Sequence, residues 1–223
     1  MEDDIKKRTA IFTNAVQEIF GERLLSVMGY GSIAAGSYIK GRSDINLVVV
    51  IDRLTVEEIL MLRKKILKIS LKNRLLPFFF SAEFIRSSSD IFPVEWKEIK
   101  EHHIILYGKD FAADITVKKE EMRLQLEREL KQNYIDFQQG IIYNRFLFDV
   151  LEESYRSLKV FLRNIRDVCS EEIEEPEYFP RLDIILTGKR PYLSNEPLRK
   201  ISQEHLSFLE RLIKIIDKPG GRQ

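Results

Sequence analysis

The sequence has few cysteines and histidines and no long apolar run, and each scarcity excludes a class of protein. One cysteine in 223 residues cannot form an internal disulfide, so nothing calls for an oxidising compartment. We expect no zinc site, because His102 and His103 are adjacent and point to opposite sides of a strand, while His205 and Cys169 lie far along the chain. No apolar run reaches the length of a signal peptide or a membrane span. We therefore expect a cytoplasmic protein with no membrane partner.

What the chain does contain is typical of a soluble globular protein. Hydrophobic residues make up 44% and charged residues 32%, which is too apolar for disorder and too charged for a bilayer. The length suits one large or two small domains. Lys and Arg number 36 against 35 Asp and Glu, a net charge of +1. This balance disfavours non-specific nucleic-acid binding through the overall charge and leaves only a local basic patch open.

The first half of the chain alternates helical and strand-like patterns. Apolar residues recur at helical spacing in residues 4–20 and again after Thr55, whose side chain is expected to form a capping box with Glu58. The run INLVVVI at 45–51 is the most β-branched of the chain and predicts a central strand. The other expected elements are a strand ending at the glycines of GYGS, a strand at 77–81, a helical turn at 81–88, and strands at 92–99 and 102–108.

The second half is helical in pattern. Long amphipathic helices are predicted over 120–137 and 145–168, with Gln138, Gln139 and Gly140 interrupting the pattern between them. A charged loop at 171–177 and a last helix over 197–217 follow. The predicted fold class is an α/β (α+β) mixed sheet followed by an all-α helical bundle. We place the α/β domain at residues 1–112 and the bundle at 113–223.

The segment GYGSIAAGSYIKGRSDINLVVVID, residues 29–52, is the most informative about chemistry. Gly31 and Ser32 follow a predicted strand and could bring backbone N–H groups and a hydroxyl close to a phosphate. Asp44 and Asn46 lie two residues apart where the next strand begins, so both side chains are expected on one face, roughly 7 Å apart at the backbone. Mg²⁺ is held by a few such oxygens together with substrate phosphates. By composition alone, however, the pattern favours a plain turn followed by a strand entry.

The segment resembles the signature of the polymerase-beta-type nucleotidyltransferase superfamily. That signature is an apolar strand, a Gly-Ser pair, a spacer, and then Asp, an apolar residue, a second acid and another apolar residue. The residues that match are Gly31, Ser32, Asp44, Ile45, Asn46 and Leu47. The third carboxylate of the family lies on a later strand between apolar residues, where Glu95 fits and Glu98 is the alternative. The chain as a whole is similar to bacterial members with a helical C-terminal domain, such as the kanamycin and lincosamide nucleotidyltransferases.

The resemblance implies a Mg²⁺-dependent nucleotidyltransferase that moves a nucleoside monophosphate from an NTP, ATP first among them, to a hydroxyl-bearing acceptor. It implies that Gly31 and Ser32 hold the triphosphate, together with three residues of the loop that follows, Lys40, Arg42 and Ser43. Lys40 and Arg42 are otherwise solvated loop residues, and Ser43 is otherwise a turn cap.

The metal site is implied in the same way. Asp44, Asn46 and Glu95 would bind the metal, and Asp44 and Glu95 would be the catalytic residues, with Glu95 as the base. The acceptor stays open between a small molecule, a protein and an RNA end, and so does homodimer formation.

Asn46 departs from the family pattern, which has an acid at this position. An amide offers one neutral oxygen and no charge, so a two-metal site is in doubt while one Mg-nucleotide remains credible. The alternative hypothesis is therefore a catalytically degenerate protein of this fold that binds nucleotide or a protein partner without turnover. An antitoxin-like role beside a helical toxin is disfavoured, because the chain carries its own helical half and that half lacks the Arg and His spacing of a helical ribonuclease.

Overall fold

The structure, a computed structural model, describes residues 3–41, 43–144, 146–169, 172–186 and 195–218. The chain divides into two compact units, Met1–Lys118 and Lys119–Gln223. The division falls a few residues after the predicted boundary at 112 and 113. Ala112 and Ile115 are buried in the core of the first unit, which explains why the segment after residue 108 stays with that unit.

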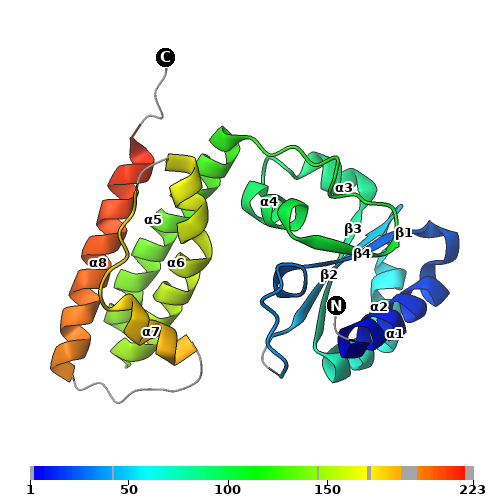
Figure 1. Ribbon diagram of the computed structural model, residues 1–223, viewed down its shortest axis with the longest axis horizontal. Coiled ribbons are helices and arrows are strands. Elements are labelled where there is room, and N and C mark those ends of the chain that lie inside the picture. Colours follow the sequence, from blue (N-terminus) through cyan, green and yellow to red (C-terminus); the bar gives the residue numbers. More distant parts are fainter. Residues whose placement is uncertain (1–2, 42, 145, 170–171, 187–194, 219–223) are drawn as a thin grey trace. The chain divides into compact units, whose positions relative to one another are not determined.

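The first unit is an α/β fold whose element order follows the predicted alternation except at residues 92–99 (Figure 1). Its sheet has the order β3-β2-β1-β4, with β1 antiparallel to β2 and β4, and β2 parallel to β3. A parallel pair needs a crossover connection, and helix α2 provides it between β2 and β3. The elements are α1 (Asp3–Phe20), η1 (Gly21–Arg23), β1 (Leu24–Tyr30), η2 (Gly31–Ile33), β2 (Ile45–Ile51), α2 (Val56–Asn73), β3 (Leu75–Ser81), α3 (Ala82–Ser87), α4 (Pro93–Glu101) and β4 (His103–Gly108).

Helices cover both faces of this sheet, so the central strand β2 is buried on both sides. Leu47 and Val49 point to the face covered by α1 and α2, where they pack with Phe12 and Ile66. Val48 and Val50 point to the other face, where they pack against residues of α3 and α4. The two-sided burial accounts for the uninterrupted apolar run that predicted β2 from the sequence.

The strand predicted at residues 92–99 is wrong, because these residues form helix α4. Phe92, Val94 and Trp96 alternate as in a strand, but the side chains that are buried include Pro93, Trp96 and Ile99 at helical spacing. Pro93 also stands at the start of the helix, where proline is favoured. Glu95 and Glu98 therefore lie on a helix, and only the strand at β4 remains of the two predicted there.

The second unit is helical, as predicted. It consists of α5 (Lys119–Tyr143), α6 (Leu147–Cys169), α7 (Phe179–Leu186) and α8 (Asn195–Asp217). Gly140 does not interrupt α5: a Cβ on this residue would lie 2.5 Å from Val150 Cγ1, so glycine here lets α5 and α6 approach closely. Helix α7 was not predicted. Among the described residues, none of the helices is both long and apolar enough to cross a membrane.

Candidate nucleotide site

The candidate site begins at Gly31, where β1 ends in the short turn η2. Gly31 has φ +71°, a left-handed conformation that favours glycine, and its carbonyl accepts the N–H groups of Ala34 and Ala35, both at 2.9 Å. A Cβ at Gly31 would lie 3.2 Å from Asn46 Nδ2 and 3.9 Å from Glu98 Oε1. The missing side chain thus leaves room between an amide and a carboxylate that converge on this turn.

Asn46 reaches the turn because it lies opposite Tyr30 in the antiparallel pairing of β1 and β2. Side chains alternate along a strand, so Asn46 shares the face of Val48, which packs in the cluster of the α4 residues Trp96 and Ile99. The amide therefore points toward the face of the sheet that α4 covers, and not toward α1 and α2.

Helix α4 brings Glu98 to the same place. Glu95 and Glu98 are three residues apart and hence neighbours on the helix surface. Burial raises the pKa of Tyr30 to about 12, and the carboxylates of Glu98 and, more weakly, Glu95 add to this rise. Both acids are therefore near the end of β1, and Glu98 is the one beside Gly31 and Asn46. The choice between Glu95 and Glu98 as the third carboxylate stays a prediction.

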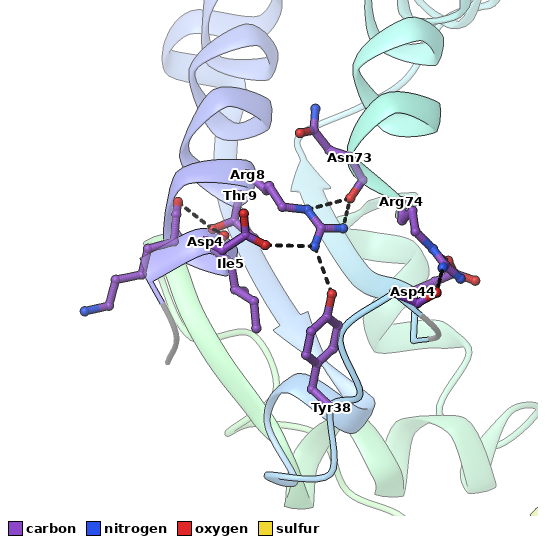
Figure 2. A network of polar contacts seen from close by, with 10 residues as sticks. Asp4, Ile5, Arg8, Thr9, Tyr38, Asp44, Asn73 and Arg74 are labelled. Carbon is purple, nitrogen blue, oxygen red and sulfur yellow. Dashed lines mark hydrogen bonds and ion pairs between the residues drawn. The ribbon is translucent and has the colours of Figure 1, made fainter. Parts of the chain in front are cut away.

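Asp44 is held by an arginine that the sequence analysis did not single out. Asp44 Oδ1 accepts a hydrogen bond from Arg74 Nε at 2.9 Å (Figure 2), and Arg74 Nη1 also donates to the carbonyl of Gly41. Arg74 lies between α2 and β3, and its carbonyl accepts the N–H of Ile45 at 2.9 Å. Since β2 and β3 are parallel and pair Ile45 with Leu75, the residues just before the two strands are neighbours. That register is the signal that could have identified Arg74.

A second arginine, Arg8 of α1, attaches α1 to the loop at residues 34–44 between η2 and β2. Arg8 donates from Nη1 to the Tyr38 hydroxyl at 2.8 Å and from Nε to the Asn73 carbonyl at 2.8 Å (Figure 2). The residue after Asn73 is Arg74, so both arginines tie the loop that runs from η2 to β2 to the end of helix α2.

The remaining predicted residues lie in or near this loop. Ser43 Oγ accepts the N–H of Ile39 at 3.0 Å, which is the turn-capping geometry. Lys40 is an exposed loop residue, and Ser32 lies in η2 with its carbonyl accepting the Ser37 N–H at 3.0 Å. Arg42 lies outside the described residues.

The described residues offer few acidic ligands for a metal ion near the Gly31 turn. No group of three or more His, Cys, Asp or Glu in the described parts of the chain could hold a metal ion. Asp44 and Asn46 offer a carboxylate and an amide oxygen at the start of β2, with the carboxylate of Glu98 next to Asn46 at Gly31. Such oxygens are the ligands that Mg²⁺ takes when substrate phosphates complete its shell.

Known proteins resemble this chain in structure and not in sequence. No protein-family model and no curated protein sequence matches it. A spectinomycin adenyltransferase from Enterococcus, solved with ATP and spectinomycin, superposes with a TM-score of 0.60 and 12% identity over 95% of this chain and 99% of that one.

Two further solved structures match more weakly. A nucleotidyltransferase-like protein from Exiguobacterium sibiricum gives a TM-score of 0.37 at 14% identity, covering 93% of this chain and 74% of that one. A toxin-antitoxin complex with AMP-PNP gives 0.34 at 16% identity, covering 57% and 93%. The match to the adenyltransferase shows that the chain has the polymerase-beta-type nucleotidyltransferase fold, an α/β unit with a helical unit after it.

Proposed function

We propose that the chain is a nucleotidyltransferase that binds a nucleoside triphosphate at the Gly31 turn and transfers its nucleoside monophosphate to a hydroxyl-bearing acceptor. The observation that carries the proposal is the convergence of Asn46 and Glu98 on a glycine with positive φ at the end of β1. The adenyltransferase of the same fold was solved with ATP, which makes ATP the first nucleotide to test.

The triphosphate would lie against the Gly31 turn. Gly31 has no side chain to block the approach of a phosphate, and Ser32 adds a hydroxyl and a backbone N–H. Lys40 and Arg42 would contribute positive charge from the loop, with Arg42 suited to a bidentate contact. Ser43, by its hydrogen bond to Ile39, would hold the loop in shape and not contact phosphate directly.

Mg²⁺ would be held by Asp44 and Asn46, with Glu95 or Glu98 as the third ligand. When bound, the ion neutralises the charge that develops on the phosphates during transfer. Asn46 supplies an oxygen but no negative charge. The proposed site therefore has one carboxylate fewer than the family pattern.

The transfer step makes one bond and breaks one. The acceptor hydroxyl oxygen bonds to the α-phosphorus, the bond from that phosphorus to the bridging oxygen of the β-phosphate breaks, and pyrophosphate leaves. The hydroxyl proton passes to a carboxylate, and we assign this base role to Glu98 or Glu95 because both lie near the end of β1. The acceptor class, whether small molecule, protein or RNA end, stays open.

A second candidate function is nucleotide binding without turnover. Two observations favour it: an amide stands at position 46, and Asp44 is already paired with Arg74. In this case the same turn would bind the triphosphate while the carboxylates needed for transfer would be too few.

Assays with labelled ATP, Mg²⁺ and a panel of hydroxyl-bearing acceptors that includes small molecules, protein and RNA ends, run on wild type, Asp44→Ala and Asn46→Asp, distinguish the two functions. If the chain is an enzyme, the wild type releases pyrophosphate and Asp44→Ala lowers the rate at least about a hundredfold. If it is a binder, the wild type binds ATP without releasing pyrophosphate, and Asn46→Asp gains measurable turnover. Wild type that neither binds ATP nor releases pyrophosphate contradicts both functions.

A further inference from the structure

The ion pair between Arg74 and Asp44 places a cation of the chain on the carboxylate that the proposed function assigns to the metal. Arg74 Nε lies 2.9 Å from Asp44 Oδ1, and the same guanidinium donates through Nη1 to the Gly41 carbonyl. A carboxylate that accepts an arginine at this distance is a weaker ligand for a second cation, because both cations compete for the same charge.

The backbone of Arg74 has a left-handed conformation, which is unusual for this residue type. Arg74 is the C-cap of helix α2, with φ 52° and ψ 48°. Among the described residues that are not glycine, only Arg74 has a positive φ. Glycine or asparagine is usual at such a helix end. The arginine tolerates this conformation while its carbonyl accepts the Ile45 N–H and its side chain reaches Asp44. Backbone and side chain together attach Arg74 to the start of β2.

The contact is nevertheless open to exchange. About 40% of the side-chain surface of both partners is exposed, 40% for Arg74 and 43% for Asp44, so an ion can reach the carboxylate from solvent. Ion pairs at such exposure are weak enough for a divalent cation to displace them. We propose that Arg74 is a positioning residue that pairs with Asp44 and must leave it before a divalent cation binds there. This inference rests on the proposed function only in taking Asp44 as a metal ligand.

Metal binding without nucleotide tests the proposal directly. Mn²⁺ serves as a spectroscopic substitute for Mg²⁺, and electron paramagnetic resonance reports the free ion during titration of wild type, Arg74→Gln and Arg74→Lys. The loss of an exposed ion pair corresponds to a change of about fivefold in an equilibrium constant, and removal of a nearby positive charge acts in the same direction. We expect Arg74→Gln to lower the Kd for Mn²⁺ at least about fivefold, and Arg74→Lys, which keeps the charge, to stay within about twofold of wild type.

Arg23→Gln is the matched control, because Arg23 pairs with Asp52 and Glu58 at the opposite end of β2 and should leave the Mn²⁺ affinity unchanged. Adding Asp44→Asn to Arg74→Gln should abolish the gain. The proposal is overturned if Arg74→Gln binds Mn²⁺ no tighter than wild type, if none of the variants binds it, or if the gain survives Asp44→Asn. A circular-dichroism melt of each variant checks that it is folded. A wild type that fails to bind ATP while Arg74→Gln gains Mn²⁺ affinity would contradict the proposed function and leave this inference standing.

Discussion

The buried histidine of the second unit gives that unit a stability that depends on pH. His205 on α8 has no exposed surface. Its Nε2 lies 2.8 Å from Ser154 Oγ on α6, and its Nδ1 lies 2.9 Å from the hydroxyl of Tyr178. The Phe137 ring packs against it in a T-shaped arrangement with ring centroids 5.0 Å apart. A neutral imidazole, which has one donor and one acceptor, satisfies both hydroxyl partners, whereas a protonated one would be a buried charge without a carboxylate partner in this network.

The sign and size of the effect follow from linkage. Burial lowers the pKa of His205 from 6.5 to about 4. Between these values the unfolded chain binds the proton and the folded chain does not, so the free energy of unfolding falls as the pH falls from about 6.5 toward 4. The loss is about 2 kcal/mol at pH 5 and approaches about 3 kcal/mol below pH 4, by the conversion of 1.36 kcal/mol per pKa unit.

Urea unfolding at pH 7, 6 and 5 measures the loss. Far-UV circular dichroism follows the helices of both units, while fluorescence of the single tryptophan, Trp96, follows the first unit. We expect the acid-induced loss in His205→Gln to be smaller than in wild type by about 2 kcal/mol at pH 5. The matched control His102→Gln, in the first unit, should show the same fall in the free energy of unfolding between pH 7 and pH 5 as wild type. Equal losses in wild type and His205→Gln would refute the reasoning.

Three further substitutions, one of them paired with a control substitution, test the fold of the first unit by denaturant unfolding. Gly108→Ala should cost at least about 3 kcal/mol, since its φ is +75° and a Cβ there would lie 2.1 Å from the backbone oxygen of Leu25; a cost below about 1 kcal/mol would contradict this close approach. Thr55→Ala should cost about 1 kcal/mol, because it removes the side-chain acceptor of the capping box with Glu58, and no loss would mean that the box is not formed. Arg8→Met should cost about 1–3 kcal/mol by leaving the Asn73 carbonyl without its donor, whereas Asp4→Asn, at the exposed end of the same network, should cost less than about 0.5 kcal/mol; equal costs would contradict the assignment.

The sequence was sufficient for elements whose burial pattern is local. The β-branched run of β2 and the capping box before α2 both appear where they were predicted, because two-sided burial and capping leave a direct trace in the residue order. The fold class was also predicted correctly, since it follows from the change from mixed to purely helical patterns.

The errors arose where two periodicities overlap or where partners are distant in sequence. Residues 92–96 alternate like a strand over a span too short to exclude a helix, and the joint burial of Pro93, Trp96 and Ile99 shows the helical spacing. Gly140 looks like a helix breaker until the close approach of Val150 is known. Arg74 is the partner of Asp44 because the register between β2 and β3 pairs Ile45 with Leu75. The two residues are separated in the sequence by β2 and helix α2, so the sequence alone does not show that they are neighbours.

The binding of ATP at the Gly31 turn is the central claim, and the ATP affinity of wild type, Gly31→Ala and Gly21→Ala tests it most directly. Both glycines have positive φ, so the two substitutions strain the backbone alike, but a Cβ at Gly31 meets Asn46 whereas one at Gly21 meets no atom within 4 Å. Isothermal titration should show that wild type binds Mg-ATP, that Gly31→Ala binds it at least about tenfold more weakly, and that Gly21→Ala stays within about twofold of wild type. No binding by wild type, or equal affinity in Gly31→Ala and wild type, would contradict the account.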